Sequence, residues 1–154
     1  DTKQHNIPLN TWIKNEVGNV IYCKTRNKVL PFRAIYETIR KIFSVDIIHY
    51  SSAYYYLTIY TLFWSVLLNK KVVVSPRGEF FDNAIDSFKK KVVIKLYRIT
   101  YKKILFHATS NEEKDSILKL FPKANIVIQP NFIQIETANK TEVKNKNIVF
   151  LGII

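Results

Sequence analysis

The segment Lys71–Phe80, KVVVSPRGEF, carries the side chains of this chain that are best placed to do chemistry. Its three consecutive valines are typical of a strand that is buried on both faces. A serine-proline pair ends the strand, because proline cannot continue ladder pairing, and Arg77, Gly78 and Glu79 follow at once. Arg77 offers a rigid fork of donors, and Glu79 offers an acceptor or a base. We therefore predict that both lie at the carboxyl end of a strand, where open α/β sheets bind ligands.

Apolar runs alternate with helical periodicities over most of the chain. We expect strands at 19–24, 46–50, 71–75, 105–109, 125–129 and 148–151. We expect helices from Pro31 to about 43, from Ser51-Ser52 to about 68, over 84–103, and from Ser110 to about 121. Connections of this length imply parallel crossovers. The predicted fold is α/β, with a Rossmann-like parallel sheet and helices on both faces.

Polar residues follow four of these strands and should meet at one edge of the sheet. They include Ser51, Ser75, Thr109, Ser110 and Asn131, and His49 lies at the end of the second strand. His49 joins Arg77 and Glu79 as a candidate catalytic residue, with a buried strand-end histidine as the alternative. For Arg77 and Glu79 the alternative is a salt-bridged turn. Ser110 and Glu113 have the spacing of a capping box, and a cap and an anion site use the same free N–H groups.

The chain is strongly basic, with 154 residues and a formal net charge of +12. This charge admits an anionic membrane, a nucleic acid or a phosphorylated substrate as partner. Four basic residues recur at helical spacing and should line one stripe: Lys91, Lys95, Arg98 and Lys102. We interpret this stripe as membrane-facing, against the alternative of a solvated helix face. The apolar side of the same helix is predicted to comprise Val92, Val93, Leu96, Ile99 and Ile104.

The cysteine content, the length of the apolar runs and the placement of the aromatic residues bear on which classes of function this chain can have. The single cysteine, Cys23, permits no internal disulfide and no cysteine metal cluster, which favours a reducing, cytoplasmic compartment. The longest apolar run, 57–68, is shorter than a bilayer requires. The aromatic residues cluster in an apolar helix instead of alternating with basic ones, which argues against nucleic acid. We expect no metal and no cofactor.

Read in order, the strand ends resemble the amino-terminal domain of retaining glycosyltransferases of the large family 4 group, which have the GT-B fold. The matching segments are DIIHYSS at 46–52, KKVVVSPRGEFF at 70–81, FHATSNEE at 106–113, FPKANIVIQPNFI at 121–133 and NIVFLGII at 147–154. The resemblance implies that this domain holds the acceptor, while a second domain binds a nucleotide-sugar donor. It implies substrate contacts by Ser51, Ser75, Arg77, Gly78, Glu79, Thr109, Ser110 and Asn131.

The chain also departs from the family pattern. The family often has a second histidine where Ser51 stands, and a glycine where Phe132 follows Asn131. Its first strands should precede Asp1, and its donor domain should follow residue 154. The resemblance therefore implies a partial acceptor domain at 1–133, an interdomain linker at 134–147 and the first strand of a donor domain at 148–154. Strand edges left unpaired would favour dimerisation.

The function predicted from the resemblance is transfer of a sugar from a nucleotide-sugar donor to a cell-surface glycan or a lipid-linked acceptor. Such an enzyme would serve polysaccharide or lipopolysaccharide assembly as a peripheral protein on the inner face of the plasma membrane. This fragment alone is expected to be inactive. Two alternatives stay open: a basic non-catalytic module that binds a membrane surface or nucleic acid, and a degenerate remnant of a transferase.

Overall fold

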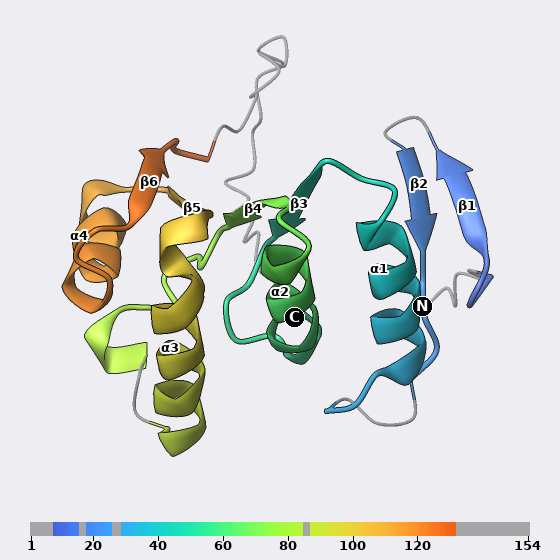
Figure 1. Ribbon diagram of the computed structural model, residues 1–154, viewed down its shortest axis with the longest axis horizontal. Coiled ribbons are helices and arrows are strands. Elements are labelled where there is room, and N and C mark those ends of the chain that lie inside the picture. Colours follow the sequence, from blue (N-terminus) through green and yellow to red (C-terminus); the bar gives the residue numbers. More distant parts are fainter. Residues whose placement is uncertain (1–7, 16–17, 26–28, 85–86, 132–154) are drawn as a thin grey trace, which may run out of the picture.

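The computed structural model describes residues 8–15, 18–25, 29–84 and 87–131 (Figure 1). Its strands are β1 Trp12–Asn15, β2 Gly18–Ile21, β3 Ile47–Tyr50, β4 Lys71–Val74, β5 Ile104–Ala108 and β6 Asn125–Ile128. Its helices are α1 Phe32–Ile42, α2 Tyr56–Leu67, α3 Phe88–Thr100 and α4 Asn111–Leu120, with 3₁₀ turns at Asp82–Ala84 and Tyr101–Lys103. The predicted segments 134–147 and 148–154 lie outside the described residues.

The centre of the molecule is a four-stranded parallel sheet in the order β3-β4-β5-β6. Each strand pairs with the next one along the chain, through a helix that crosses over between them. The predicted α/β class with a Rossmann-like parallel sheet is confirmed. All four carboxyl ends consequently emerge at the same edge.

The helices between the strands pack on one face of the sheet, where Figure 1 shows α2 and α3 beneath the strands. Right-handed crossovers that always step in the same direction place every connecting helix on the same side. The opposite face carries exposed Ile47, Leu105 and Val127. The expected second layer of helices is thus not found in the described part of the chain, because the strand order runs in one direction without a reversal.

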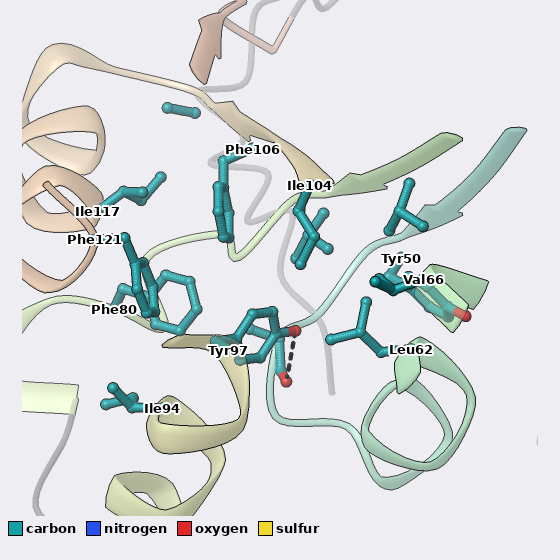
Figure 2. Packing of buried hydrophobic residues seen from close by; sticks show 14 residues of the cluster. Tyr50, Leu62, Val66, Phe80, Ile94, Tyr97, Ile104, Phe106, Ile117 and Phe121 are labelled. Carbon is teal, nitrogen blue, oxygen red and sulfur yellow. Dashed lines mark hydrogen bonds between the residues drawn. The ribbon is translucent and has the colours of Figure 1, made fainter. Parts of the chain in front are cut away.

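Aromatic side chains fill the core between the sheet and its helices. Phe80, Tyr97, Phe106 and Phe121 are each at most 1 % exposed, and Figure 2 shows their rings gathered in one cluster. The Phe80 ring lies edge-on to the other three, with centroids 5.5–6.1 Å apart, an arrangement that aromatic quadrupoles favour. Since Phe80 follows directly after the SPRGE turn, burial of its ring anchors that turn to the core.

The amino-terminal part differs from the expectation. β1 lies before the first predicted strand, where no strand or helix was predicted, and it pairs antiparallel with β2 in a separate hairpin. The Nζ of Lys41, on α1, lies 4.9 Å from the centre of the Trp12 ring. The strand predicted at 19–24 is therefore a hairpin strand and not a member of the parallel sheet.

Helix α3 is shorter than predicted and buries a different side. It begins after Ser87, whose hydroxyl accepts a hydrogen bond from the Lys89 amide. Its buried residues are Ile94, Tyr97 and Thr100, and the Tyr97 hydroxyl donates to the Ala53 carbonyl at 3.2 Å. Val92 and Ile99, expected inside, are 50 % and 81 % exposed. This rotation places Tyr97 in the core, where its ring is buried and its hydroxyl has the hydrogen-bond partner that a buried tyrosine usually finds.

Candidate functional site

The carboxyl edge of the sheet brings two histidines to one serine. Side chains alternate between the faces of a strand, so His49 on β3, Ser75 after β4 and His107 on β5 all face the side without helices. The Nε2 of His49 lies 2.7 Å from the Ser75 hydroxyl, and the Nδ1 of His107 lies 2.8 Å from the same oxygen. The Nε2 of His107 donates to the Gln129 carbonyl at 3.0 Å. One continuous hydrogen-bond chain therefore crosses all four strand ends.

The Ser75 hydroxyl is the enclosed member of this chain. Ser75 is 2 % exposed, and its amide donates to the Tyr50 carbonyl at 2.8 Å. His49 is exposed and His107 is half-buried. A hydroxyl covered in this way contacts the two imidazoles and is poorly placed to touch a ligand directly.

The turn after β4 has an unusual backbone. The Glu79 amide donates to the Pro76 carbonyl at 3.1 Å, and the two residues between them have positive φ, 52° at Arg77 and 79° at Gly78. Two consecutive residues of this kind are the signature of a type I′ turn. Gly78 suits its place, because a Cβ there would also meet the Phe81 ring at 3.0 Å. Arg77 has no such freedom, and the left-handed region costs an L-residue about 1 kcal/mol or more.

Glu113 of α4 holds this turn from one side. Its carboxylate is buried and accepts hydrogen bonds from the Gly78 amide at 2.6 Å and from the Thr109 amide at 2.7 Å. The Thr109 hydroxyl donates to the same carboxylate at 2.9 Å. The predicted cap is present, since the Ser110 hydroxyl accepts from the Glu113 amide. The carboxylate, however, is directed to the neighbouring turn instead of completing a capping box.

Glu79 holds the turn from the other side. Its carboxylate accepts from the Ser52 hydroxyl at 2.8 Å and from the amides of Ala53 and Tyr54 at 2.5 and 3.4 Å. The β3–α2 loop is thereby tied to the turn after β4. The structure gives Glu79 a positioning role in this edge, and its oxygens are already engaged by donors of the fold.

Arg77 is the exposed cation of the edge. Its side chain has no hydrogen bond or ion pair within the described residues, so its donors are available. Partial burial of the imidazole, then the nearby His107 and Arg77, lower the pKa of His49 below its usual value. His49 is therefore neutral at physiological pH and can accept a hydrogen bond beside a fixed positive charge.

The other predicted contact residues lie at the same edge. Ser51 is exposed at the end of β3, Thr109 and Ser110 are half-buried where β5 meets α4, and Asn131 is exposed beyond β6. His107 was missed by the sequence reasoning. The sequence did contain a signal for it. His107 lies two residues before the predicted contact residue Thr109, just as the predicted His49 lies two residues before Ser51, so each histidine points to the same face of its strand as the contact residue two positions later.

The basic stripe is only partly brought together. Lys91, Lys95 and Arg98 line one shallow hollow of about 250 Å³ between α3 and α4. Lys102 lies beyond the end of α3 and lines a different hollow with Lys71 and Lys103, at the amino edge of the sheet. The exposed apolar side chains of Phe88, Val92 and Ile99 stand on the same helix as the first three.

In the ranges that the structure describes, no cluster of histidine, cysteine and carboxylate side chains could hold a metal ion. No helix in those ranges has both the length and the apolar character to cross a bilayer.

Comparison of the chain with protein-family models, curated proteins and solved structures finds no match. The resemblance to a glycosyltransferase domain therefore stays a prediction from the segments quoted above.

We predict that Glu113→Gln lowers the free energy of unfolding by about 2–3 kcal/mol, because a buried carboxylate loses charge-assisted bonds to three donors. Urea unfolding measures the loss, and the amide proton shifts of Gly78 and Thr109 report the broken contacts. Asp115→Asn is the matched control, since it removes an exposed carboxylate from the same helix, and it should leave stability nearly unchanged. Equal stability of the two variants would contradict this role.

Arg77→Gly should raise the free energy of unfolding by up to about 1 kcal/mol, because glycine adopts positive φ without strain. Arg77→Ala removes the same guanidinium but keeps the strained backbone, so it should bring no such gain. Thermal or urea unfolding of both variants makes the comparison. A glycine variant less stable than the alanine variant would show that Arg77 is not strained.

Proposed function

We propose that this chain is the acceptor-side domain of a retaining glycosyltransferase of the family 4 group that it resembles. The reaction would move a sugar from a nucleotide-sugar donor to a cell-surface glycan or a lipid-linked acceptor. A second domain would bind the donor, so this domain alone should not carry out transfer.

One observation carries the proposal: Arg77, whose side chain has no hydrogen-bond or ion-pair partner among the described residues, is held in a strained backbone conformation at the carboxyl edge of a parallel sheet. Backbone strain that the surroundings enforce tends to occur at functional sites. Here two carboxylates and a buried aromatic ring enforce it. A turn with only a structural task would be expected to have glycine or asparagine at this position.

The geometry suits recognition of a polar, anionic ligand. The Arg77 guanidinium can form paired hydrogen bonds to a phosphate or to vicinal hydroxyls. Neutral His49 beside it can accept a hydrogen bond from a hydroxyl group. Holding an acceptor hydroxyl in place against a donor sugar would contribute mainly through orientation, with Arg77 balancing the negative charge of the leaving group.

Glucose 1-phosphate should shift the amide resonances of residues 51–54, 77–79 and 107–110 in a ¹H–¹⁵N spectrum, and methyl glucoside should shift them less. Arg77→Gln should weaken binding of glucose 1-phosphate about tenfold, equivalent to about 1.4 kcal/mol. Arg98→Gln is the matched control, because it removes an exposed arginine from α3 and should leave binding unchanged. Absence of shifts at this edge, or equal weakening by both variants, would contradict the proposal.

A second function is favoured by the surface of α3. Lys91, Lys95 and Arg98 lie beside the exposed apolar side chains of Phe88 and Ile99, which are 80 % and 81 % exposed. Basic residues next to bare apolar ones are typical of helices that lie on an anionic membrane. We propose that this helix brings the domain to the membrane where a lipid-linked acceptor would be found.

Lys95→Gln combined with Arg98→Gln should weaken binding to vesicles of phosphatidylglycerol and phosphatidylcholine about 30-fold, since each basic residue contributes about 1 kcal/mol. Co-sedimentation at several salt concentrations measures this effect. The exposed pair Lys14→Gln and Lys24→Gln, on the amino-terminal hairpin and just after it, controls for net charge alone. If both pairs weaken binding equally, attraction is by overall charge and α3 is not the docking surface.

A further inference from the structure

The Gln129 carbonyl fixes which group donates and which accepts at each step of the hydrogen-bond chain at the sheet edge. The Gln129 carbonyl can only accept, so the Nε2 of His107 carries a proton. In neutral His107 the Nδ1 is then an acceptor, and the Ser75 hydroxyl must donate to it. With its only proton committed, the Ser75 oxygen accepts from the Nε2 of His49. The Nδ1 of His49 is left with a lone pair, and no described residue binds it.

Adding one proton at the Nδ1 of His49 can reverse both hydrogen bonds to the Ser75 hydroxyl, while the bond from His107 to the Gln129 carbonyl keeps its direction. His49 releases its Nε2 proton to the Ser75 oxygen, and Ser75 passes its own proton to the Nδ1 of His107. The result is neutral His49, now protonated on Nδ1, and a His107 imidazolium that donates to both Ser75 and Gln129. No heavy atom has to move, because donor and acceptor exchange roles at the same 2.7 and 2.8 Å contacts.

The surroundings disfavour a positive charge on His49. Arg77 and His107 are the charged or titratable groups that lower the pKa of His49. The carboxylates of Glu79 and Glu113, on the adjoining turn and helix, are occupied by backbone amides. The positive charge on His107 would be stabilised by the Gln129 carbonyl. The burial of Ser75 keeps the transfer within the chain and away from water.

We propose that His49, Ser75 and His107 form a proton relay, in which a proton taken from a ligand hydroxyl at the Nδ1 of His49 is stored as charge on His107. The identity of the ligand rests on the proposed function, in which that hydroxyl belongs to the sugar acceptor. His49 touches the ligand, whereas Ser75 and His107 are positioning residues that act through it.

Histidine side-chain ¹H–¹⁵N spectra of the chain, recorded from about pH 8 down to pH 5, test the relay directly. At the upper end both rings should be neutral and protonated on Nε2. As the pH falls, His49 should change tautomer to Nδ1–H while His107 becomes the imidazolium, and both changes should follow one shared midpoint. Two independent titrations, or a His49 that becomes the imidazolium first, would overturn the proposal.

Two variants separate the relay from a merely structural contact. Ser75→Ala removes the bridging hydroxyl, and the tautomer change of His49 should be lost completely. His107→Asn keeps a polar partner for Ser75 but cannot store a proton, so it should abolish the change as well, and it serves if Ser75→Ala does not fold. Persistence of the tautomer change in the variant that folds would exclude the relay.

The experiment is independent of sugar transfer. If the tautomer change is found but glucose 1-phosphate does not bind at Arg77, the relay stands and serves a different hydroxyl ligand. If glucose 1-phosphate binds and the tautomer change is absent, the proposed function stands and the relay is wrong.

Discussion

The whole carboxyl edge of the sheet depends on carboxylates that accept hydrogen bonds from backbone amides. Glu113 holds Gly78 and Thr109, and Glu79 holds the loop at Ala53 and Tyr54. The bonds to Gly78 and to Ala53 join segments that follow different strands, so the ends of β3, β4 and β5 are held together. The energy of these charge-assisted bonds, together with burial of Phe80, offsets the cost of keeping Arg77 at positive φ. As a result, the exposed Arg77 guanidinium is attached to a backbone turn of fixed conformation.

The one-directional strand order gives the sheet two unlike faces. The face covered by helices contains the aromatic core, where the side chains serve to pack the sheet against the helices. The other side leaves alternate residues of every strand available, and this is why His49 and His107 can reach the same hydroxyl. Parallel sheets are usually covered on both faces. In the described part of this sheet, the exposed side chains of Ile47, Leu105 and Val127 form an apolar surface next to the polar residues at the carboxyl edge.

Local features were predictable from the sequence, and features that depend on register were not. The strand-turn break at SPRGE and the Ser110 cap follow from neighbouring residues, so both were recognised. The meeting of His49 with His107 requires the order and stagger of three strands, which no short segment encodes. The rotation of α3 could not be predicted either, because its buried side contacts segments distant in the sequence, such as Ala53, which is 44 residues from Tyr97. The sequence predicts Glu113 only as part of a helix cap, because its contact with the Gly78 amide joins residues 35 positions apart.

The sequential pairing of the strands also bears on how the molecule forms. Each strand of the parallel sheet finds its partner only one crossover away in the chain. Loop closure over short separations costs little entropy, so the sheet can grow by one strand and one helix at a time. During synthesis, β3 and β4 could associate before β6 has left the ribosome. The hydrogen bond from the Gly78 amide to Glu113 forms only after β5 has been added, so the turn around Arg77 acquires its final shape when α4 docks.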